Sequence, residues 1–274
     1  MEKIYIFDIS SLVFRYHFAL KEEVDIDGLQ NGGVFGVFFN TIRVLSRKKG
    51  TKIIWVFDGA KNNFRKLLLP SYKQNRGPVD LSIISQLAKV KTYAEEMSIP
   101  FCIHDIYEAD DLMASLVEKY KLNYIICIIG NDKDLYQLVE DERVYIWNFA
   151  KKKEKTITES IVKETLGVKP MEVGDLLALW GDSSDNISGI KRIGKETAKK
   201  LILKYGNMEA IIENEKNKYD FSNIELNKKL VNLVKDIEIP FESIKDTEYY
   251  DFLNFIEKKE ILIFNKLLNS TFYK

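Results

Sequence analysis

The hydrophobic positions of the chain fall into four short, nearly continuous runs, and acidic residues follow each of them. The runs cover residues 3–7, 52–57, 99–103 and 124–129. Unbroken runs of this kind are typical of strands buried on both faces, as in a parallel sheet. Stretches with helical character lie between them, at residues 33–49, 81–97, 109–121 and 135–140. This alternation predicts a doubly wound α/β domain.

Acidic side chains stand where the predicted strands end. Asp8 follows the first run, Asp58 the second, and Asp132 and Asp134 the last. Each could be a turn residue, since Asp-Gly, as at Asp58, is a common turn signal. Binding sites of doubly wound sheets lie at the carboxyl ends of the strands. Several acids at that edge therefore favour a metal site over a set of turns.

The short run Glu108-Ala109-Asp110-Asp111 adds three more carboxylates. If a helix begins here, Glu108 and Asp111 lie one turn apart on one face, with Asp110 beside them. Carboxylates this close repel one another, which favours a hard cation between them. The alternative is an ordinary acidic helix N-terminus, where Asp and Glu are stabilising. The acids at the strand ends favour the metal site.

From about Thr158 the pattern becomes mainly helical. Asp182 and Asp185 precede a tight basic hairpin that is bracketed by Gly189 and Gly194. A helix from Lys195 would present free backbone N–H groups to a phosphate. An ordinary helix–turn–helix with a solvated lysine face is the alternative. We predict an α/β domain over residues 1–157 and a helical domain over residues 158–274.

The composition excludes several classes of protein. Lys and Arg number 41, as do Asp and Glu, so net charge argues for no particular partner. Two histidines and no paired cysteines argue against a zinc site. Cys102 and Cys127 lie in apolar runs and are expected to be buried, reduced thiols. Without a transmembrane-length run or a secretory signal, we expect a cytoplasmic, monomeric protein that does not bind membranes.

Together, the motifs resemble those of the 5′ nuclease family, which includes the nuclease domain of bacterial DNA polymerase I, the phage 5′ exonucleases and, more distantly, flap endonucleases. The matching pieces, in the family's order and spacing, are Phe7-Asp8, Phe57-Asp58-Gly59, Phe64-Arg65, Pro70 to Arg76, Glu108 to Asp111, Asp132 to Leu135, and Gly181 to Ile187. The resemblance covers nearly the whole chain. It implies a PIN-like α/β domain with a helical arch, then a helical domain with a helix–three-turn–helix. Because the chain ends at Lys274, a nuclease free of any polymerase is expected.

The resemblance implies two Mg²⁺ sites, at which Mn²⁺ is expected to substitute. The first site would use Asp8, Asp58, Glu108, Asp110 and Asp111, and the second Asp132, Asp134, Asp182 and Asp185. Lys73, Asp111, Asp132 and Asp185 are the expected catalytic residues. Phosphodiester hydrolysis suits such a site, since one metal lowers the pKa of a water and both stabilise the transition state.

Nucleic-acid contacts are implied in two regions. Arg65, Tyr72, Lys73 and Arg76 match the base of the arch, where Lys73 would contact the scissile phosphate and Tyr72 would stack on an unpaired base. The second region matches the hairpin that grips duplex backbone, with Gly189, Lys191, Arg192, Gly194, Lys195, Lys199 and Lys200. Lys191 and Arg192 replace the family's Pro and Gly. That departure bears on the loop geometry and on a K⁺ site that the resemblance implies there.

The expected function is a divalent-metal-dependent 5′→3′ exonuclease and 5′-flap endonuclease acting on branched or 5′-ended DNA. RNA primers and RNA–DNA hybrids are further expected substrates. A non-catalytic protein that binds branched DNA is the alternative, which lost carboxylates would favour, and none is lost. The duplex-gripping hairpin argues against a third reading, a single-strand ribonuclease of the PIN fold.

Overall fold

The computed structural model of the chain describes residues 1–25, 27–47, 50–150, 153–241 and 243–259. Its centre is a seven-stranded sheet with the order β3-β2-β1-β4-β5-β6, in which β9 also pairs with β2. The strands are β1 (Lys3–Asp8), β2 (Thr51–Val56), β3 (Phe101–Cys102), β4 (Ile125–Ile129), β5 (Val144–Ala150), β6 (Lys153–Ile157) and β9 (Asp246–Thr247). The pairs among β1 to β5 are parallel, while β6 and β9 are antiparallel to their neighbours.

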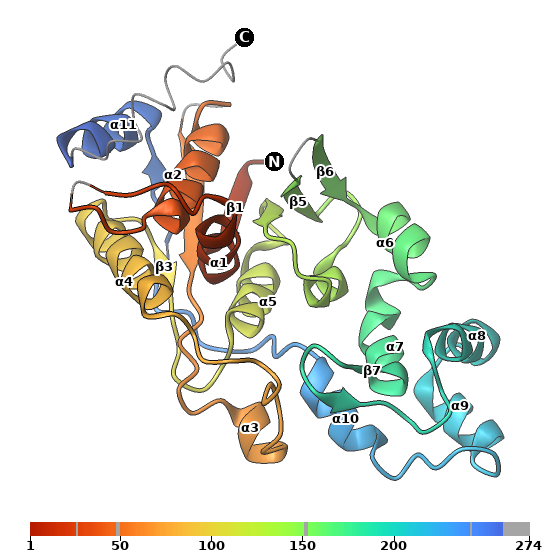
Figure 1. Ribbon diagram of the computed structural model, residues 1–274. Helices are drawn as coiled ribbons and strands as arrows, with labels where there is room; N and C mark the ends of the chain where they lie inside the picture. The colour runs from red at the N-terminus through yellow and green to blue at the C-terminus, as the bar shows by residue number, and fades with distance from the viewer. Residues whose placement is uncertain (26, 48–49, 151–152, 242, 260–274) are drawn as a thin grey trace.

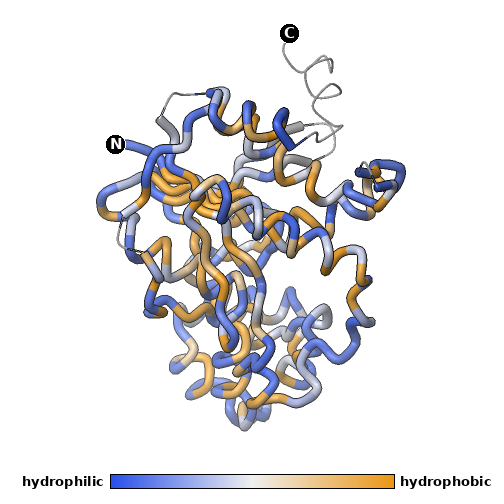
Figure 2. Tube along the Cα trace, turned by 90° about the vertical axis from the view of Figure 1, so that its left-hand side faces the viewer, coloured by the Kyte–Doolittle hydropathy of each residue, from blue (hydrophilic) through white to orange (hydrophobic). Residues whose placement is uncertain are grey.

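Side chains of the central strands alternate between two hydrophobic cores, one on each face of the sheet. In β1, Ile4 and Ile6 belong to one core and Phe7 to the other. In β2, Ile54 and Trp55 divide in the same way. Because successive side chains of a strand point to opposite faces, only a strand apolar at every position fills both cores. In Figure 2 the hydrophobic positions gather inside the fold and the outer turns are mostly hydrophilic.

Helices cover both faces of the sheet. One face carries α1 (Ile9–Ala19), α2 (Gly32–Leu45), α4 (Leu81–Glu96) and α11 (Tyr249–Lys258), which share one core. Figure 1 shows α11 beside α2, although they lie at opposite ends of the chain. The other face carries α5 (Ala109–Tyr120) and the short 3₁₀ helix η1 (Asp134–Leu138). This arrangement is the doubly wound α/β fold that the sequence predicts.

The helical part of the chain continues the core of the second face. It contains α6 (Glu159–Leu166), the 3₁₀ helix η2 (Pro170–Glu172), α7 (Val173–Trp180), α8 (Lys195–Tyr205), α9 (Met208–Glu215) and α10 (Ile224–Val231). Between α7 and α8 lies a small antiparallel ribbon of β7 (Gly181–Asp182) and β8 (Ile187–Ser188). The remaining helix, α3 (Phe64–Leu68), precedes the segment that contains Lys73 and packs on α10. A sheet domain followed by a helical unit is therefore confirmed.

Several local predictions were wrong. The helix expected at residues 135–140 is the single 3₁₀ turn η1, and β5 and β6 were not predicted as strands. Strand β9 and helix α11 fall in the predicted helical domain, yet β9 pairs with β2 and α11 packs on α2, both in the α/β part of the chain. The boundary at residue 157 stays a prediction. The apolar pattern near the end of the chain also predicts core positions at Phe252, Phe255, Ile261, Ile263 and Phe264. Phe252 is buried and Phe255 is partly buried, whereas the other three lie outside the described residues.

Across the part of the chain that the structure describes, no helix combines the length and the apolar character that crossing a membrane requires.

Candidate metal centre and nucleic-acid interface

The carboxyl edge of the sheet carries the strand-end acids at the point where the strand order reverses. Strand β1 lies between β2 and β4, and doubly wound sheets bind ligands at such a point. Asp8 ends β1 and accepts a hydrogen bond from the backbone N–H of Ser11 at 2.9 Å, which makes it the N-cap of α1. Asp58 follows β2, and its N–H donates to Ser10 Oγ at 2.8 Å. Asp132 follows β4, so all three acids reach the same edge.

Asp8, Asp58, Asp110 and Asp132 lie close enough for their charges to affect one another. Burial is the main cause that raises the pKa of Asp8 to about 7, and the charges of Asp132 and Asp58 add to it. Burial, together with the charges of Asp132 and Asp8, raises the pKa of Asp110 well above its ordinary value. Buried carboxylates whose charges also raise one another's pKa are disfavoured in the ionised form, and a bound cation would offset both effects. Asp8, Asp58 and Asp110 belong to the first predicted metal site, whereas Asp132, which was predicted for the second site, lies close to Asp8 and Asp110.

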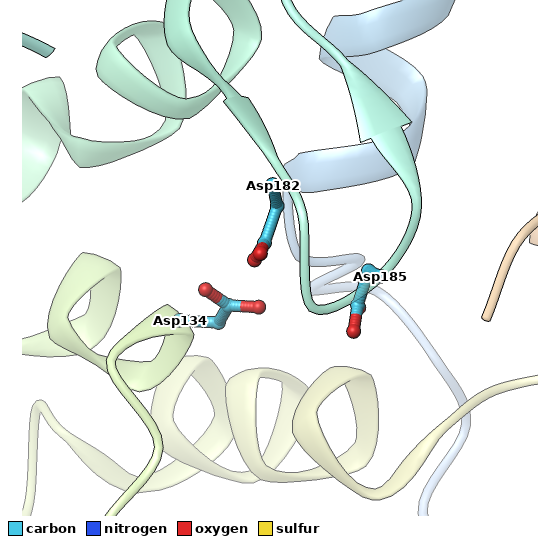
Figure 3. Close-up of side chains that lie close together, drawn as sticks. All are labelled: Asp134, Asp182 and Asp185. Atoms are coloured by element: carbon cyan, nitrogen blue, oxygen red, sulfur yellow. The ribbon is translucent and has the colours of Figure 1, made fainter. Parts of the chain in front are cut away.

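A second group consists of Asp134, Asp182 and Asp185, which converge from η1, β7 and the turn after β7 (Figure 3). One carboxylate oxygen from each lies within 4.8 Å of the others. Asp134 Oδ1 is buried and has no hydrogen-bond partner among the described residues. Burial and the charges of Asp132, Asp182 and Asp185 raise the pKa of Asp134 to about 7. An unpartnered oxygen among converging carboxylates fits a hard divalent cation.

Asp182 has partners that hold it in the charged form. Ser184 donates to Asp182 Oδ1 from its hydroxyl at 2.7 Å and from its backbone N–H at 2.9 Å. Lys133 Nζ lies 3.1 Å from Asp182 Oδ2. Burial acts to raise the pKa of Asp182, but these hydrogen bonds and the lysine outweigh it and lower the pKa. Lys133 was not among the predicted site residues, although its place between Asp132 and Asp134 is a signal that it should lie at the site.

Two side chains from the segment after α3, Tyr72 and Lys73, connect Glu108 to Asp185, and a third, Arg76, contacts Asp185 alone. The hydroxyl of Tyr72 lies 2.8 Å from Glu108 Oε2 and 2.9 Å from Asp185 Oδ2, so its proton can be donated to either. Lys73 Nζ lies 2.5 Å from Glu108 Oε1 and 3.6 Å from Asp185 Oδ2. Arg76 Nη2 donates to Asp185 Oδ1 at 2.5 Å. Lys73 and Arg76 are thus placed beside the acids, as predicted for residues that contact phosphate.

The structure corrects the predictions for Asp111 and Arg65. The Arg65 guanidinium donates to both oxygens of Asp111, at 2.6 and 2.7 Å, and also bonds the backbone carbonyl of Leu230. The Asp111 oxygens accept in addition from the N–H groups of Glu108 and Val234. Asp111 is 0% exposed and Arg65 2% exposed. With its acceptor sites occupied, Asp111 is placed as a structural residue rather than a metal ligand or catalyst, and Arg65 is closed to nucleic acid.

Tyr72 requires a similar correction. Its side chain is 2% exposed and packs into the core below the sheet edge. A ring in that position cannot stack on an unpaired base. Burial and the neighbouring charges of Glu108 and Asp185 raise the pKa of Tyr72, so it remains a protonated donor to those carboxylates. The sequence alone shows the motif and not the direction of the ring.

The glycines in and before the hairpin have different roles. Gly181 adopts a left-handed φ of 85°, which favours glycine. At Gly189, a Cβ atom would collide with the backbone of Trp180 and Gly181. Gly194 is the N-cap of α8 and has open space around it. Gly189 therefore shapes the turn between β8 and α8, while Gly194 leaves the helix N-terminus accessible, as phosphate binding requires.

Arg192 folds back onto the protein. Its φ of 71° is left-handed, where an arginine is strained and glycine is favoured. The guanidinium donates to the backbone carbonyl of Lys218 and lies 5.8 Å from the centre of the Tyr219 ring. Lys191 beside it is exposed. Arg192 is thus a strained residue that is held in place by contacts with the loop after α9.

Helix α8 carries three lysines in its first two turns, next to its exposed N-terminus. Lys195 Nζ lies 5.7 Å from the centre of the Trp180 ring, Lys199 pairs with Glu196 at 3.1 Å, and Lys200 is exposed. The helix starts at Lys195, as the sequence predicts. Its free N–H groups and these ammonium groups form a basic surface one short ribbon away from Asp182 and Asp185. Such a surface suits a nucleic-acid backbone.

The doubly wound sheet, the convergent acids at its edge and the adjoining basic hairpin define a class of protein: a nuclease of the α/β type with a divalent-metal site. Comparison with known proteins agrees. Residues 3–167 match the family model of the 5'-3' exonuclease, N-terminal resolvase-like domain, and residues 168–252 match that of the 5'-3' exonuclease, C-terminal SAM fold. The chain belongs to the 5'-3' exonuclease family, which confirms the resemblance drawn from its motifs.

Relatives within the family include a 5'-3' exonuclease of Aquifex aeolicus, 32% identical over 246 residues that cover 87% of this chain and 84% of the relative. DNA polymerase I of Caldicellulosiruptor bescii is 31% identical over 95% of this chain and 33% of its own length. Among solved structures, T5 D15 protein co-crystallised with metal ions has a TM-score of 0.65 at 21% identity, with 97% of each chain covered. The catalytic core of Rad2 in complex with DNA substrate has a TM-score of 0.60 at 18% identity, covering 98% of this chain and 91% of Rad2.

Proposed function

We propose that the protein hydrolyses phosphodiester bonds at the 5′ ends and 5′ flaps of DNA, using two divalent metal ions. One observation carries the proposal: Asp134, Asp182 and Asp185 converge with a buried, unpartnered oxygen, and Asp185 is bonded to Arg76. Carboxylates that can bind a metal ion are thus in direct contact with the Arg76 guanidinium, a positive charge that can bind a phosphate. A binding module would need the basic surface but not the convergent acids.

The residues that would hold the metals are Asp8, Asp58, Asp110 and Asp132 in one group and Asp134, Asp182 and Asp185 in the other, with Glu108 between them. Bound metal ions would supply a water of lowered pKa and charge stabilisation at the phosphoryl group. We propose Mg²⁺ as the working ion, with Mn²⁺ able to replace it, because an all-oxygen ligand set suits both. A K⁺ site at the hairpin, RNA–DNA hybrids as substrates, a monomeric state and a cytoplasmic location stay predictions.

Lys73 would act as a fixed positive charge rather than as a base. Burial acts to lower its pKa, but the charges of Glu108 and Asp185 outweigh burial and raise it. The ammonium therefore stays protonated near neutral pH and can stabilise the negative charge that develops on a phosphate. Arg76, whose pKa those same carboxylates raise against the effect of burial, would assist from the solvent side. The hydroxyl of Tyr72 holds the two carboxylates in place beneath them.

The α8 N-terminus and its lysines would bind the duplex part of the substrate through its backbone. The β7–β8 ribbon joins this surface directly to Asp182 and Asp185. Duplex bound at the hairpin would therefore place one end of a strand over the acids. This geometry favours a substrate with duplex next to a free 5′ end.

The test is a cleavage assay with 5′-flap, nicked, blunt and single-stranded DNA, each with Mg²⁺ and with excess chelator. We expect cleavage of the flap and the nicked duplex, no cleavage in chelator, and binding without turnover in Ca²⁺. Asp134→Asn should remove cleavage and retain flap binding. Asp236→Asn, an exposed acid elsewhere on the chain, is the matched control and should cleave normally. Binding of branched DNA without cleavage by the wild type would establish the binding module instead.

A further inference from the structure

Two loops that meet at the candidate site are joined by a reciprocal pair of asparagine side chains. Asn75 Nδ2 donates to the backbone carbonyl of Ser183 at 2.8 Å. Asn186 Nδ2 donates back to the backbone carbonyl of Ser71 at 2.7 Å. A carbonyl only accepts hydrogen bonds, so the amide nitrogen must face it in both cases. We call these two residues the amide clamp; they join residues 71–76 to residues 183–186.

Lys73 lies in the middle of this junction. Its backbone N–H donates to the carbonyl of Asp185 at 2.9 Å, between the two asparagine contacts. Its φ of 54° is left-handed, a conformation that a lysine does not favour without support. Asn186 is also left-handed, with a φ of 59°, but asparagine tolerates that conformation. A strained residue persists only where its surroundings determine it, and the amide clamp lies on either side of this one.

We propose that Asn75 and Asn186 are positioning residues that hold Lys73 in its strained conformation, so that its ammonium meets the scissile phosphate. The proposal rests on the proposed function, since it gives Lys73 its task. Neither asparagine touches a carboxylate of the candidate site through a contact that the structure shows, and both side chains are exposed. Their effect on the reaction would therefore pass through Lys73.

The amide clamp also connects Lys73 to the duplex-binding surface. Asn186 immediately precedes β8, which leads through Gly189 to the hairpin. A duplex that shifts the hairpin would move residues 183–186, and the clamp would carry the movement to Lys73. Without the clamp, the hairpin would still bind duplex, but Lys73 would no longer be placed by that binding. We therefore expect the cleavage rate to fall with little change in duplex affinity.

The experiment is a double-mutant cycle with Lys73→Ala. Asn75→Ala and Asn186→Gly each remove one amide, and glycine keeps the left-handed backbone at position 186 without strain. In the wild-type background each variant should lower the single-turnover cleavage rate by about tenfold, a barrier increase near 1.4 kcal/mol. In the Lys73→Ala background each should change the rate by less than about twofold, because the group it positions is gone. Asn214→Ala, which removes an exposed amide bonded to the carbonyl of Ala210 at 2.8 Å, is the control.

Equal fold-losses in both backgrounds would overturn the proposal, because the asparagines would then act on the metal site or on the fold. An unchanged rate in both single variants would overturn it as well. A second measurement does not depend on cleavage: hydrogen exchange of the peptide that contains residues 71–76. Asn186→Gly should expose the Lys73 amide to exchange, whereas Asn214→Ala should not. If the wild type does not cleave DNA, the proposed function fails, and the exchange result still decides whether the clamp holds Lys73.

Discussion

Arg65 and Asp111 form a buried, bidentate ion pair, with hydrogen bonds of 2.6 and 2.7 Å. The pair joins α3 to the first turn of α5, and the same guanidinium bonds the carbonyls of Leu230 and Asn232 at the end of α10. One arginine thus connects the helical part of the chain to the α/β part. A buried pair with every partner in place is costly to break from one side.

We predict that Asp111→Ala lowers the free energy of unfolding by about 3–5 kcal/mol, because it leaves the Arg65 guanidinium buried without its counter-charge. Urea denaturation measures the change. Glu118→Ala, which breaks a partly exposed pair with Lys121, should cost less than about 1 kcal/mol. If Asp111→Ala unfolds like the wild type and loses only cleavage, Asp111 is a metal ligand after all.

We predict that divalent-metal affinity rises with pH through neutrality. Burial is the largest cause that raises the folded-state pKa of both Asp8 and Asp134 to about 7, above the ordinary carboxylate value. Below that pKa the metal must displace protons, so affinity should fall by up to about tenfold per pH unit for each proton displaced. Calorimetric titration with Ca²⁺ at pH values of about 6 and about 8 measures the effect. Equal affinity at both pH values would show that these carboxyls are not ligands.

Asp8 and Asp134 also set the direction in which the stability of the metal-free protein changes with pH. The unfolded chain loses these protons near the ordinary carboxylate pKa, whereas the folded protein keeps them to about 7. Their contribution to the free energy of unfolding is therefore fully present below the ordinary pKa and is lost as pH rises through about 7. Stabilisation by added Ca²⁺, measured as a shift in Tm, should be larger on the alkaline side. Asp134→Asn should reduce this pH dependence.

Lys73→Ala should lower the cleavage rate far more than it weakens duplex binding. Loss of one group that stabilises transition-state charge typically costs about 10²- to 10³-fold in rate. Duplex affinity should change by less than about threefold, since one phosphate contact is lost among many. Single-turnover cleavage in Mg²⁺ and a binding titration in Ca²⁺ separate the two effects. Parallel losses in both measurements would make Lys73 an electrostatic anchor only.

Changing Lys195, Lys199 and Lys200 together to Ala should weaken duplex binding and reduce its salt dependence. Each lost phosphate contact lowers the slope of log affinity against log salt by about 0.9. Lys200 should contribute most, because Lys199 is already paired with Glu196. Lys258→Ala, on α11 at the other side of the molecule, is the control for overall charge. An unchanged slope in the triple variant would place the duplex elsewhere.

Much of the fold was predictable because the strongest signals are local. Runs that are apolar at every position mark β1, β2 and β4, and their terminal acids mark the edge where the site lies. Strand β5 was missed although its sequence is largely apolar, and β6 was missed because it begins with three charged residues and lies at the edge of the sheet. Its identity as a strand depends on pairing with β5, and a sequence pattern does not show pairing.

Individual roles within the motifs were less predictable. Asp110 and Asp111 are adjacent and chemically identical, yet one contributes to the acidic group and the other binds Arg65, 46 residues away. Tyr72 and Lys73 are also adjacent and both contact Glu108 and Asp185, but the Tyr72 ring is buried, whereas Lys73 brings a positive charge to the acids. In both pairs the direction of the side chain decides the role, and tertiary packing sets that direction. Lys133, Asn75 and Asn186 were missed because their partners come from distant loops.

The order in which the chain is synthesised has a consequence for the edge of β2. Strand β3 pairs only with Trp55 and Val56, while β9 pairs with Thr51 and Lys52, and Lys52 bonds Asp246 from 194 residues away. During translation, Thr51 and Lys52 on this edge of β2 lack their partner strand β9 until almost all of the described chain has left the ribosome. An open edge on an otherwise formed sheet is a site for association with other chains. The nascent protein should therefore depend on chaperones until β9 has been made, and truncation before Asp246 should yield aggregates rather than a stable α/β half.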